Sequence, residues 1–254
     1  FETNPFNHLF YKPKDVEIRY GLAVEHIGFT PKSYELPEIQ FRDRPFAAAI
    51  MLKSFMITTN QEKKSRFTSS FSLGIIGPGA FGKEMQVGIH KATGNKIPLG
   101  WQNQIKSDVV INYEVGYEKQ LVKYHDLFSL QATVNAKIGT LFTNASVGFN
   151  STFGIINAPF SSSSKRNSFV LYAYAQPVLN LIGYDATLQG GVFNKQSPYT
   201  ILSGVVERLT AQFNYGIVLK TKTLYFEYSR SVITKEFTSG DSYKWGGVKV
   251  GFTL

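Results

Sequence analysis

The sequence contains no cysteine, which excludes a disulfide framework and a thiolate metal site. It has no apolar run that could cross a membrane as a helix: the longest one near the N-terminus covers residues 46–52, against the roughly 18–20 residues that a helical span needs. Only four histidines are present, and no two of them have the spacing of metal ligands. Thiol redox chemistry, a helical membrane span and a histidine-based metal site are therefore not expected.

Several familiar functional motifs are also missing. There is no Gly-x-Ser-x-Gly nucleophile motif, and residues 77–79 (GPG) lack the Lys-Ser/Thr ending of a phosphate-binding loop. The net charge of +9 favours an anionic partner, which could be nucleic acid, an anionic membrane surface or a phosphorylated lipid. The lysines and arginines are dispersed rather than interleaved with aromatics, so a nucleic-acid partner is not expected.

The composition, in contrast, is rich in apolar and aromatic residues. The chain is 43% hydrophobic and 15% aromatic, which is too apolar for a disordered chain. Apolar residues alternate with polar or small ones along many segments, with the period of two of a strand that has one apolar face. Eleven segments are predicted as strands, some from weaker patterns: 16–24, 45–59, 63–76, 109–117, 128–138, 141–153, 168–180, 181–194, 205–219, 224–228 and 248–254.

The length of these strands favours a transmembrane barrel over a soluble sandwich. Several run for ten residues or more, and the face opposite the apolar one is polar and glycine-rich, as in outer-membrane barrels with a wet lumen. Short connections near 139–141 and 219–223 contrast with the longer polar segment 161–167. Single-chain bacterial barrels have an even number of strands, so we expect about twelve antiparallel strands in one domain spanning residues 1–254. The twelfth would precede Pro13 and be short or truncated, because Pro5 interrupts it.

The candidate chemical group is the pair Gln86 and His90. Residues four apart share a face of a helix and also of a strand, so the two side chains lie together in either conformation. A glutamine beside a histidine could fix the imidazole tautomer and leave the other ring nitrogen to accept a proton. The alternative is that His90 is an ordinary hydrogen-bonded loop histidine. The spacing alone favours this alternative, because Gln-x-x-x-His often occurs by chance. His8, His26 and His125 are less suggestive.

Five separated patches resemble, in the right order, the outer-membrane lipid A 3′-O-deacylase family (LpxR-type). They are residues 42–47 (RDRPFA), 75–78 (IIGP), the residues Gly82, Glu84, Gln86 and His90, residues 100–105 (GWQNQI) and 237–243 (FTSGDSY). The resemblance extends from about Asp43 to the C-terminus. It implies a 12-stranded barrel in the bacterial outer membrane that hydrolyses the ester-linked 3′-acyloxyacyl group of lipid A in a calcium-dependent reaction, with lipid A or lipopolysaccharide and outer-membrane lipids as partners.

The resemblance also assigns roles to residues. His90 matches the histidine that activates water, and Gln86 matches a supporting glutamine. Among the basic residues, Arg19, Lys91, Lys96 and Lys106 are predicted to contact lipid A phosphates. A segment at the mouth of the barrel is predicted to include Glu84, Trp101 and Gln104.

The chain departs from the family pattern at four places. The family's Asn-Asp pair has only residues 2–4 (ETN) as a counterpart, and Arg19 occupies a hydroxyl position. One family acid is replaced at Asn95 or Lys96 and another at Lys106. Calcium prefers oxygen ligands that include carboxylates, so these substitutions oppose its binding.

Two functional hypotheses therefore stay open. The first is an active lipid A esterase. The second is a non-catalytic family member that binds lipid or serves as a structural subunit together with other outer-membrane proteins. A general porin is less favoured, because Trp101 and the segment 77–104 are expected to narrow one mouth of the barrel.

Overall fold

The computed structural model describes residues 8–13, 16–157, 160 and 168–252 of the chain. These residues form one antiparallel sheet in which every strand pairs with its neighbours in sequence order. The strands are β1 (Glu17–Phe29), β2 (Ala47–Asn60), β3 (Ser65–Ile76), β4 (Asp108–Tyr124), β5 (Phe128–Gly139), β6 (Phe142–Ile155), β7 (Val170–Asp185), β8 (Leu209–Lys220), β9 (Leu224–Ile233) and β10 (Tyr243–Phe252).

The all-β, antiparallel prediction is confirmed, but the described residues form ten strands and not twelve. Two predicted segments, 168–180 and 181–194, are a single strand β7 followed by the short helix α2 (Ala186–Gln189). No turn residue separates the two segments, and every second side chain still points outward across the predicted boundary, as the exposed Leu179 and Leu181 show. Ahead of β1, the described residues 8–13 contain no strand, and residues 1–7 of the predicted first strand lie outside the described part.

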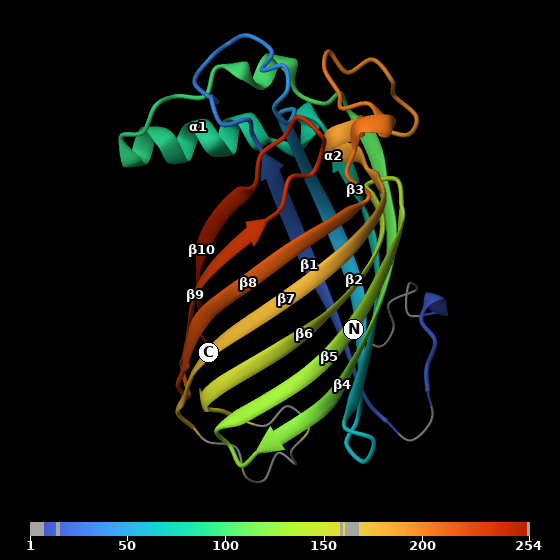
Figure 1. Ribbon diagram of the computed structural model, residues 1–254, viewed down its shortest axis with the longest axis vertical. Coiled ribbons are helices and arrows are strands. Elements are labelled where there is room, and N and C mark those ends of the chain that lie inside the picture. Colours follow the sequence, from blue (N-terminus) through green and yellow to red (C-terminus); the bar gives the residue numbers. More distant parts are fainter. Residues whose placement is uncertain (1–7, 14–15, 158–159, 161–167, 253–254) are drawn as a thin grey trace.

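The sheet curls so that its first and last strands face the same interior space (Figure 1). A cavity of about 900 Å³ is lined by Phe29 of β1, Lys137 of β5 and Trp245 of β10. Within the described residues the strand order begins at β1 and ends at β10, and no pairing between these two strands is formed there. None of the described helices has the length and apolarity of a membrane-spanning helix.

The two faces of the wall differ in polarity. Each of the ten strands has exposed apolar residues that point outward, among them Val24, Ile138, Phe153, Leu181 and Val248. Many of their strand neighbours are polar or charged and line the interior cavity, among them Lys137, Asn144 and Asn180, as expected for a wall with an apolar outside and a wet lumen.

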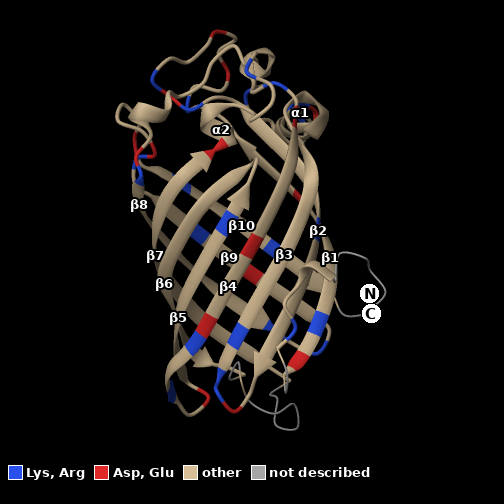
Figure 2. Ribbon diagram, turned by 90° about the vertical axis from the view of Figure 1, so that its right-hand side faces the viewer, with Lys and Arg blue, Asp and Glu red and all other residues tan. Residues whose placement is uncertain are grey.

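Charges that point into the lumen are paired across strands. The ammonium of Lys53 lies 2.8 Å from a carboxylate oxygen of Glu25 and 3.6 Å from one of Glu114, and Lys137 lies 3.6 Å from Glu114. Figure 2 shows acidic and basic residues beside each other on neighbouring strands. This pairing lets the lumen carry charges without a large net repulsion.

The connections differ between the two ends of the barrel. At one end, which we call the hairpin end, the strands are joined by the short turns 61–64, 125–127 and 221–223 and by the connection 156–169. The other end, which we call the loop end, carries α2 and the helix α1 (Gly82–Thr93) in long connections: 30–46, 77–107, 186–208 and 234–242 (Figure 1). The short connection predicted near 139–141 also lies there, whereas the polar segment 161–167 falls outside the described residues.

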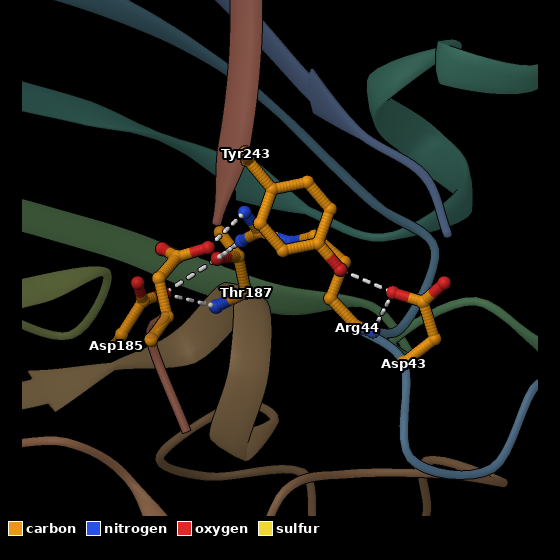
Figure 3. Close-up of polar contacts among 6 residues, drawn as sticks. Asp43, Arg44, Asp185, Thr187 and Tyr243 are labelled. Atoms are coloured by element: carbon orange, nitrogen blue, oxygen red, sulfur yellow. Dashed lines mark hydrogen bonds and ion pairs between the residues drawn. The ribbon is translucent and has the colours of Figure 1, made fainter. Parts of the chain in front are cut away.

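Arg44, in the connection 30–46 of the loop end, is surrounded by residues from other parts of the chain (Figure 3). Its side chain is only 5% exposed, and its guanidinium lies 2.8 Å from a carboxylate oxygen of Glu236. A second guanidinium nitrogen donates to the hydroxyl of Thr187 in α2 at 3.0 Å, and that hydroxyl donates to Asp185 at 2.5 Å. Arg44 therefore joins three connections that are far apart in the sequence.

Aromatic rings complete the surroundings of Arg44. Its guanidinium lies 3.9 Å from the ring centre of Phe29 at the end of β1 and 5.8 Å from that of Tyr243 at the start of β10. The Tyr243 hydroxyl donates to the carboxylate of Asp43, which also accepts the backbone N–H of Arg44 at 2.7 Å. Residues of the first strand, β1, and of the last strand, β10, thus both contact the Arg44 guanidinium.

Burial works against the charge of Glu236. It raises the pKa of this carboxyl above its ordinary value, with the nearby Asp185 adding to the rise and the Arg44 guanidinium opposing it. An ionised Glu236 consequently depends on Arg44 for its partner.

We predict that Arg44→Met destabilises the barrel by about 3–5 kcal/mol, since it leaves the buried Glu236 carboxylate without a cation. Chemical unfolding in detergent, followed by circular dichroism, measures the loss. The double variant Arg44→Met/Glu236→Gln removes both charges and should recover part of the stability. Equal stability of Arg44→Met and the unchanged chain would refute the role given to Arg44.

Candidate active site on the outer face of the barrel

Gln86 and His90 lie on α1, one helical turn apart. The helix follows the short turn η2 (Pro78–Ala80) and ends at Gly94, whose φ of 69° suits glycine and whose N–H donates to the carbonyl of His90. Gln86, Val87 and His90 are half-buried, whereas most other residues of α1 are exposed. The expectation that Gln86 and His90 share a face is therefore confirmed.

Helix α1 lies outside the lumen, against the outer face of β1 and β2. His26 and Ala48 are on the outward side of these strands, and the ring nitrogen Nε2 of His26 donates to the carbonyl of Ala80 at 2.8 Å. The approach is close at Gly82, where a Cβ atom would come within 2.3 Å of the Cβ of Ala48 and 2.6 Å of the Trp101 ring. The axis of α1 runs across the long axis of the barrel: it is seen side-on in Figure 1 and end-on in Figure 2.

The imidazole of His90 is oriented by one hydrogen bond. Its Nδ1 lies 2.5 Å from the carbonyl oxygen of Lys96, and a carbonyl can only accept, so Nδ1 carries the hydrogen. In the neutral ring, Nε2 then has the lone pair and can accept a proton. The ring of Tyr34 stands edge-on to His90, with 5.1 Å between the ring centres, and fixes its plane.

Gln86 is oriented by Trp101 in the short helix η3 (Gly100–Asn103). The indole Nε1–H donates to the Gln86 side-chain oxygen at 2.7 Å. Because an indole nitrogen can only donate, this contact identifies the oxygen and leaves the NH2 group of Gln86 available to donate elsewhere.

Trp101 links this site to the connection that contains Arg44. The Trp101 side chain is 2% exposed, and its ring lies 5.1 Å from that of Phe46, two residues after Arg44. The carbonyl of Phe46 accepts the N–H of Ile105 at 2.9 Å. Patches that carried the family resemblance in the sequence therefore meet in space.

The four basic residues predicted to contact phosphate are not brought together. Lys91 and Lys96 are exposed on α1 and on the segment after it. Lys106 is half-buried before β4, with its N–H donating to Ser197 at 3.0 Å. Arg19 pairs with Glu17 at 2.5 Å near the hairpin end, about 30 Å along β1 from the loop end at 3.3 Å per residue. Arg19 is far from the three lysines because it lies near the start of β1, at the opposite end of the strand from the loop end.

Lys96 has an acidic neighbour that the sequence did not indicate. Its ammonium lies 3.4 Å from a carboxylate oxygen of Glu35. A backbone hydrogen bond holds the pKa of Glu35 below its ordinary value, and Lys96 lowers it further, so Glu35 is ionised at neutral pH. An anionic ligand at Lys96 would compete with this carboxylate.

The predicted mouth segment lies beside the rim and not across the lumen. Glu84 is exposed on α1, and Trp101 packs with Phe46, Ala48 and Ala80. Gln104 is buried, and its side-chain oxygen has no hydrogen-bond partner among the described residues. Arg44 and Leu188 of α2, in contrast, line the interior cavity.

The described residues offer no cluster of acidic ligands that would fit calcium. Across the described part of the chain, no three His, Cys, Asp or Glu residues are grouped so that they could hold a metal ion. Among the described residues, no carboxylate forms a hydrogen bond with a ring nitrogen of His90. Residues 2–4, the counterpart of the family's Asn-Asp pair, lie outside the described part of the chain.

Sequence reasoning missed Tyr34 and the Lys96 carbonyl as partners of His90. Tyr34 is 56 residues before His90, in an irregular connection without a periodic pattern. The Lys96 contact is made by a backbone atom, and any residue type could supply it. No sequence signal pointed to the contact of either residue with His90.

Comparison with known proteins agrees with the resemblance seen in the sequence. The family model described as "Outer membrane protein LpxR" matches residues 2–254. The fold is similar to that of the solved structure of LpxR from Salmonella typhimurium, with a TM-score of 0.77 and 18% identity over 93% of this chain and 84% of that one. No curated protein sequence matches the chain significantly. The chain belongs to the LpxR family of outer membrane proteins.

Proposed function

We propose that this chain is an outer-membrane esterase that removes an ester-linked acyl chain from lipid A, at the 3′ position as the family resemblance implies. The observation that supports this best is the orientation of His90. Its Nδ1–H is held by the Lys96 carbonyl, so that Nε2 is available as a base on α1, the helix that begins against the outer wall of the barrel.

In the proposed reaction, His90 Nε2 accepts a proton from a water molecule while the water oxygen attacks the ester carbonyl carbon. The tetrahedral intermediate then breaks its bond to the sugar oxygen, and the proton on His90 passes to that oxygen. The products are a free fatty acid and a sugar hydroxyl, and His90 returns to its neutral form. The Lys96 carbonyl stabilises the imidazolium that exists between the two proton transfers.

Gln86 is placed to assist on the same face of α1. Its oxygen is occupied by Trp101, so the NH2 group is the end that can donate to the oxyanion as negative charge develops on the ester oxygen. Lys91 and Lys96 are exposed next to this face and could contact lipid A phosphates. Lys106 could contribute from the start of β4, whereas Arg19 is too far away.

The position of the site favours a lipid substrate. Residues on the outer face of an outer-membrane barrel meet lipid directly, so a lipid ester could reach His90 from the membrane without entering the lumen. Soluble esters would gain nothing from this position.

A second candidate is a non-catalytic family member that binds lipid A or joins an outer-membrane protein complex. It is favoured by the absence of a carboxylate on the His90 ring within the described residues and by the pairing of Lys96 with Glu35. Binding without hydrolysis would need only the lysines and the apolar wall.

We predict that His90→Ala lowers the rate of lipid A deacylation by about 10²- to 10⁴-fold, because the base is lost. Lipid A extracted from cells that express the protein, analysed by mass spectrometry, measures the loss of the acyl group. His125→Ala is the matched control, since His125 lies in the β4–β5 turn at the hairpin end and should leave the rate unchanged.

If the unchanged chain, folded in the outer membrane, leaves the mass of lipid A as it was, the esterase proposal fails. Lipid A that still copurifies with the protein would then support the second candidate.

Trp101→Phe should lower the deacylation rate by about tenfold while the fold is kept, because an aromatic ring still packs on Phe46 but no longer holds the Gln86 oxygen. Deacylation rates of Trp101→Phe and the unchanged chain measure the effect on catalysis, and their unfolding curves measure the effect on stability. A rate that does not change would show that the fixed orientation of Gln86 is not needed.

A further inference from the structure

One side of α1 carries apolar side chains that nothing in the described protein covers. Phe81, Met85 and Ile89 follow each other at intervals of four residues and are 60%, 46% and 54% exposed. At about 100° per residue, Met85 and Ile89 share one side of the helix, and Phe81, the residue just before α1, precedes them at the same interval. We call these three residues the apolar stripe.

The other side of α1 is charged. Lys83 and Lys91 are exposed, and each is two residues from a member of the apolar stripe, which places it about 200° around the helix. His90 lies within about 20° of Lys83 around the helix, and Gln86 lies between His90 and the apolar stripe; Gln86 and His90 are half-buried and face the protein. Helix α1 is therefore amphipathic, and its apolar side is not the side that packs on the barrel.

The backbone at Phe81 adds an independent observation. Phe81 has a φ of 59°, a left-handed conformation that costs a bulky residue about 1–2 kcal/mol. Glycine or asparagine would adopt it more easily, and the exposed ring gains little packing inside the protein. The position carries a large apolar ring despite this cost, which suggests that the ring contacts something outside the chain.

The apolar stripe continues the apolar outer wall of the barrel. Before α1, the turn η2 lies over the outward side chain of Ile75 on β3, since a Cβ atom at Gly79 would come within 2.8 Å of Ile75 Cδ1. Ile75 and Leu73 on β3 are exposed and point outward into the lipid that surrounds an outer-membrane barrel. The same lipid can therefore extend to the apolar stripe.

The direction of α1 suits such a contact. The helix runs across the barrel axis, so it lies roughly parallel to the plane of a membrane that the barrel crosses (Figures 1 and 2). Amphipathic helices in this orientation bury their apolar side at the boundary between headgroups and acyl chains and keep their charged side in the headgroup region.

We propose that α1 is an interfacial membrane helix, with Phe81, Met85 and Ile89 inserted among the acyl chains and Lys83 and Lys91 in the headgroup layer. This inference goes beyond the proposed esterase function and does not depend on it. Should the chain also be an esterase, insertion would hold His90 near the boundary of headgroups and acyl chains, where lipid ester bonds lie.

The chain has no cysteine, so single introduced cysteines can be labelled specifically. The test compares Met85→Cys with Lys83→Cys, each labelled with an environment-sensitive fluorophore in the folded chain in lipid vesicles. One set of vesicles contains phospholipid brominated in the acyl chain as a quencher, and the other is exposed to aqueous iodide. Both positions are exposed, so neither substitution removes internal packing.

We expect bromolipid to quench the label at residue 85 at least about twofold more than the label at residue 83, and iodide to show the reverse order. Ile89→Cys and Lys91→Cys form a second pair one turn later and should repeat the result. Equal iodide quenching within both pairs, with no difference in bromolipid quenching, would overturn the proposal whether or not the protein hydrolyses lipid A.

Discussion

The loop end of the barrel depends on the charge of Arg44, which is buried and can be satisfied only by groups from distant parts of the chain. Glu236 precedes β10, Thr187 belongs to α2, and the Phe29 ring ends β1. A buried guanidinium without such partners would be strongly destabilising, so these segments must meet for the fold to form. Arg44 thereby brings the first and last strands to one point.

Arg44 is also connected, through the residues that follow it in the chain, to helix α1 on the outer face of the barrel. Two residues after Arg44, Phe46 packs against Trp101, and Trp101 holds the oxygen of Gln86. The interior cation and the exterior helix α1 are thus connected by a short, packed path. An exposed helix resting on an apolar wall would otherwise have few contacts to fix its position, because α1 approaches Ala48 and Trp101 closely at Gly82 and is held near its other end by the contacts of His90 with Tyr34 and the Lys96 carbonyl.

Much of the fold could be predicted from the sequence, because alternation along a strand reports directly on the two faces of the wall. The count of strands was wrong where alternation continued without a turn, as at residues 180–181 of β7. For the candidate site, the spacing showed that Gln86 and His90 share a face, and the family resemblance gave them their role. Tyr34 and the Lys96 carbonyl were not found, and Arg19 was grouped with distant lysines, because these relations depend on how loops and strand ends meet in space.

The central claim is that the protein holds His90 with its hydrogen on Nδ1, so that Nε2 can act as a base. Nitrogen-15 NMR of histidine-labelled protein, with the His90 signals assigned by comparison with His90→Gln, reports the tautomer directly at a pH where the ring is neutral. The structure predicts a protonated Nδ1 and an unprotonated Nε2 for His90. A neutral His90 with its hydrogen on Nε2 would contradict the account.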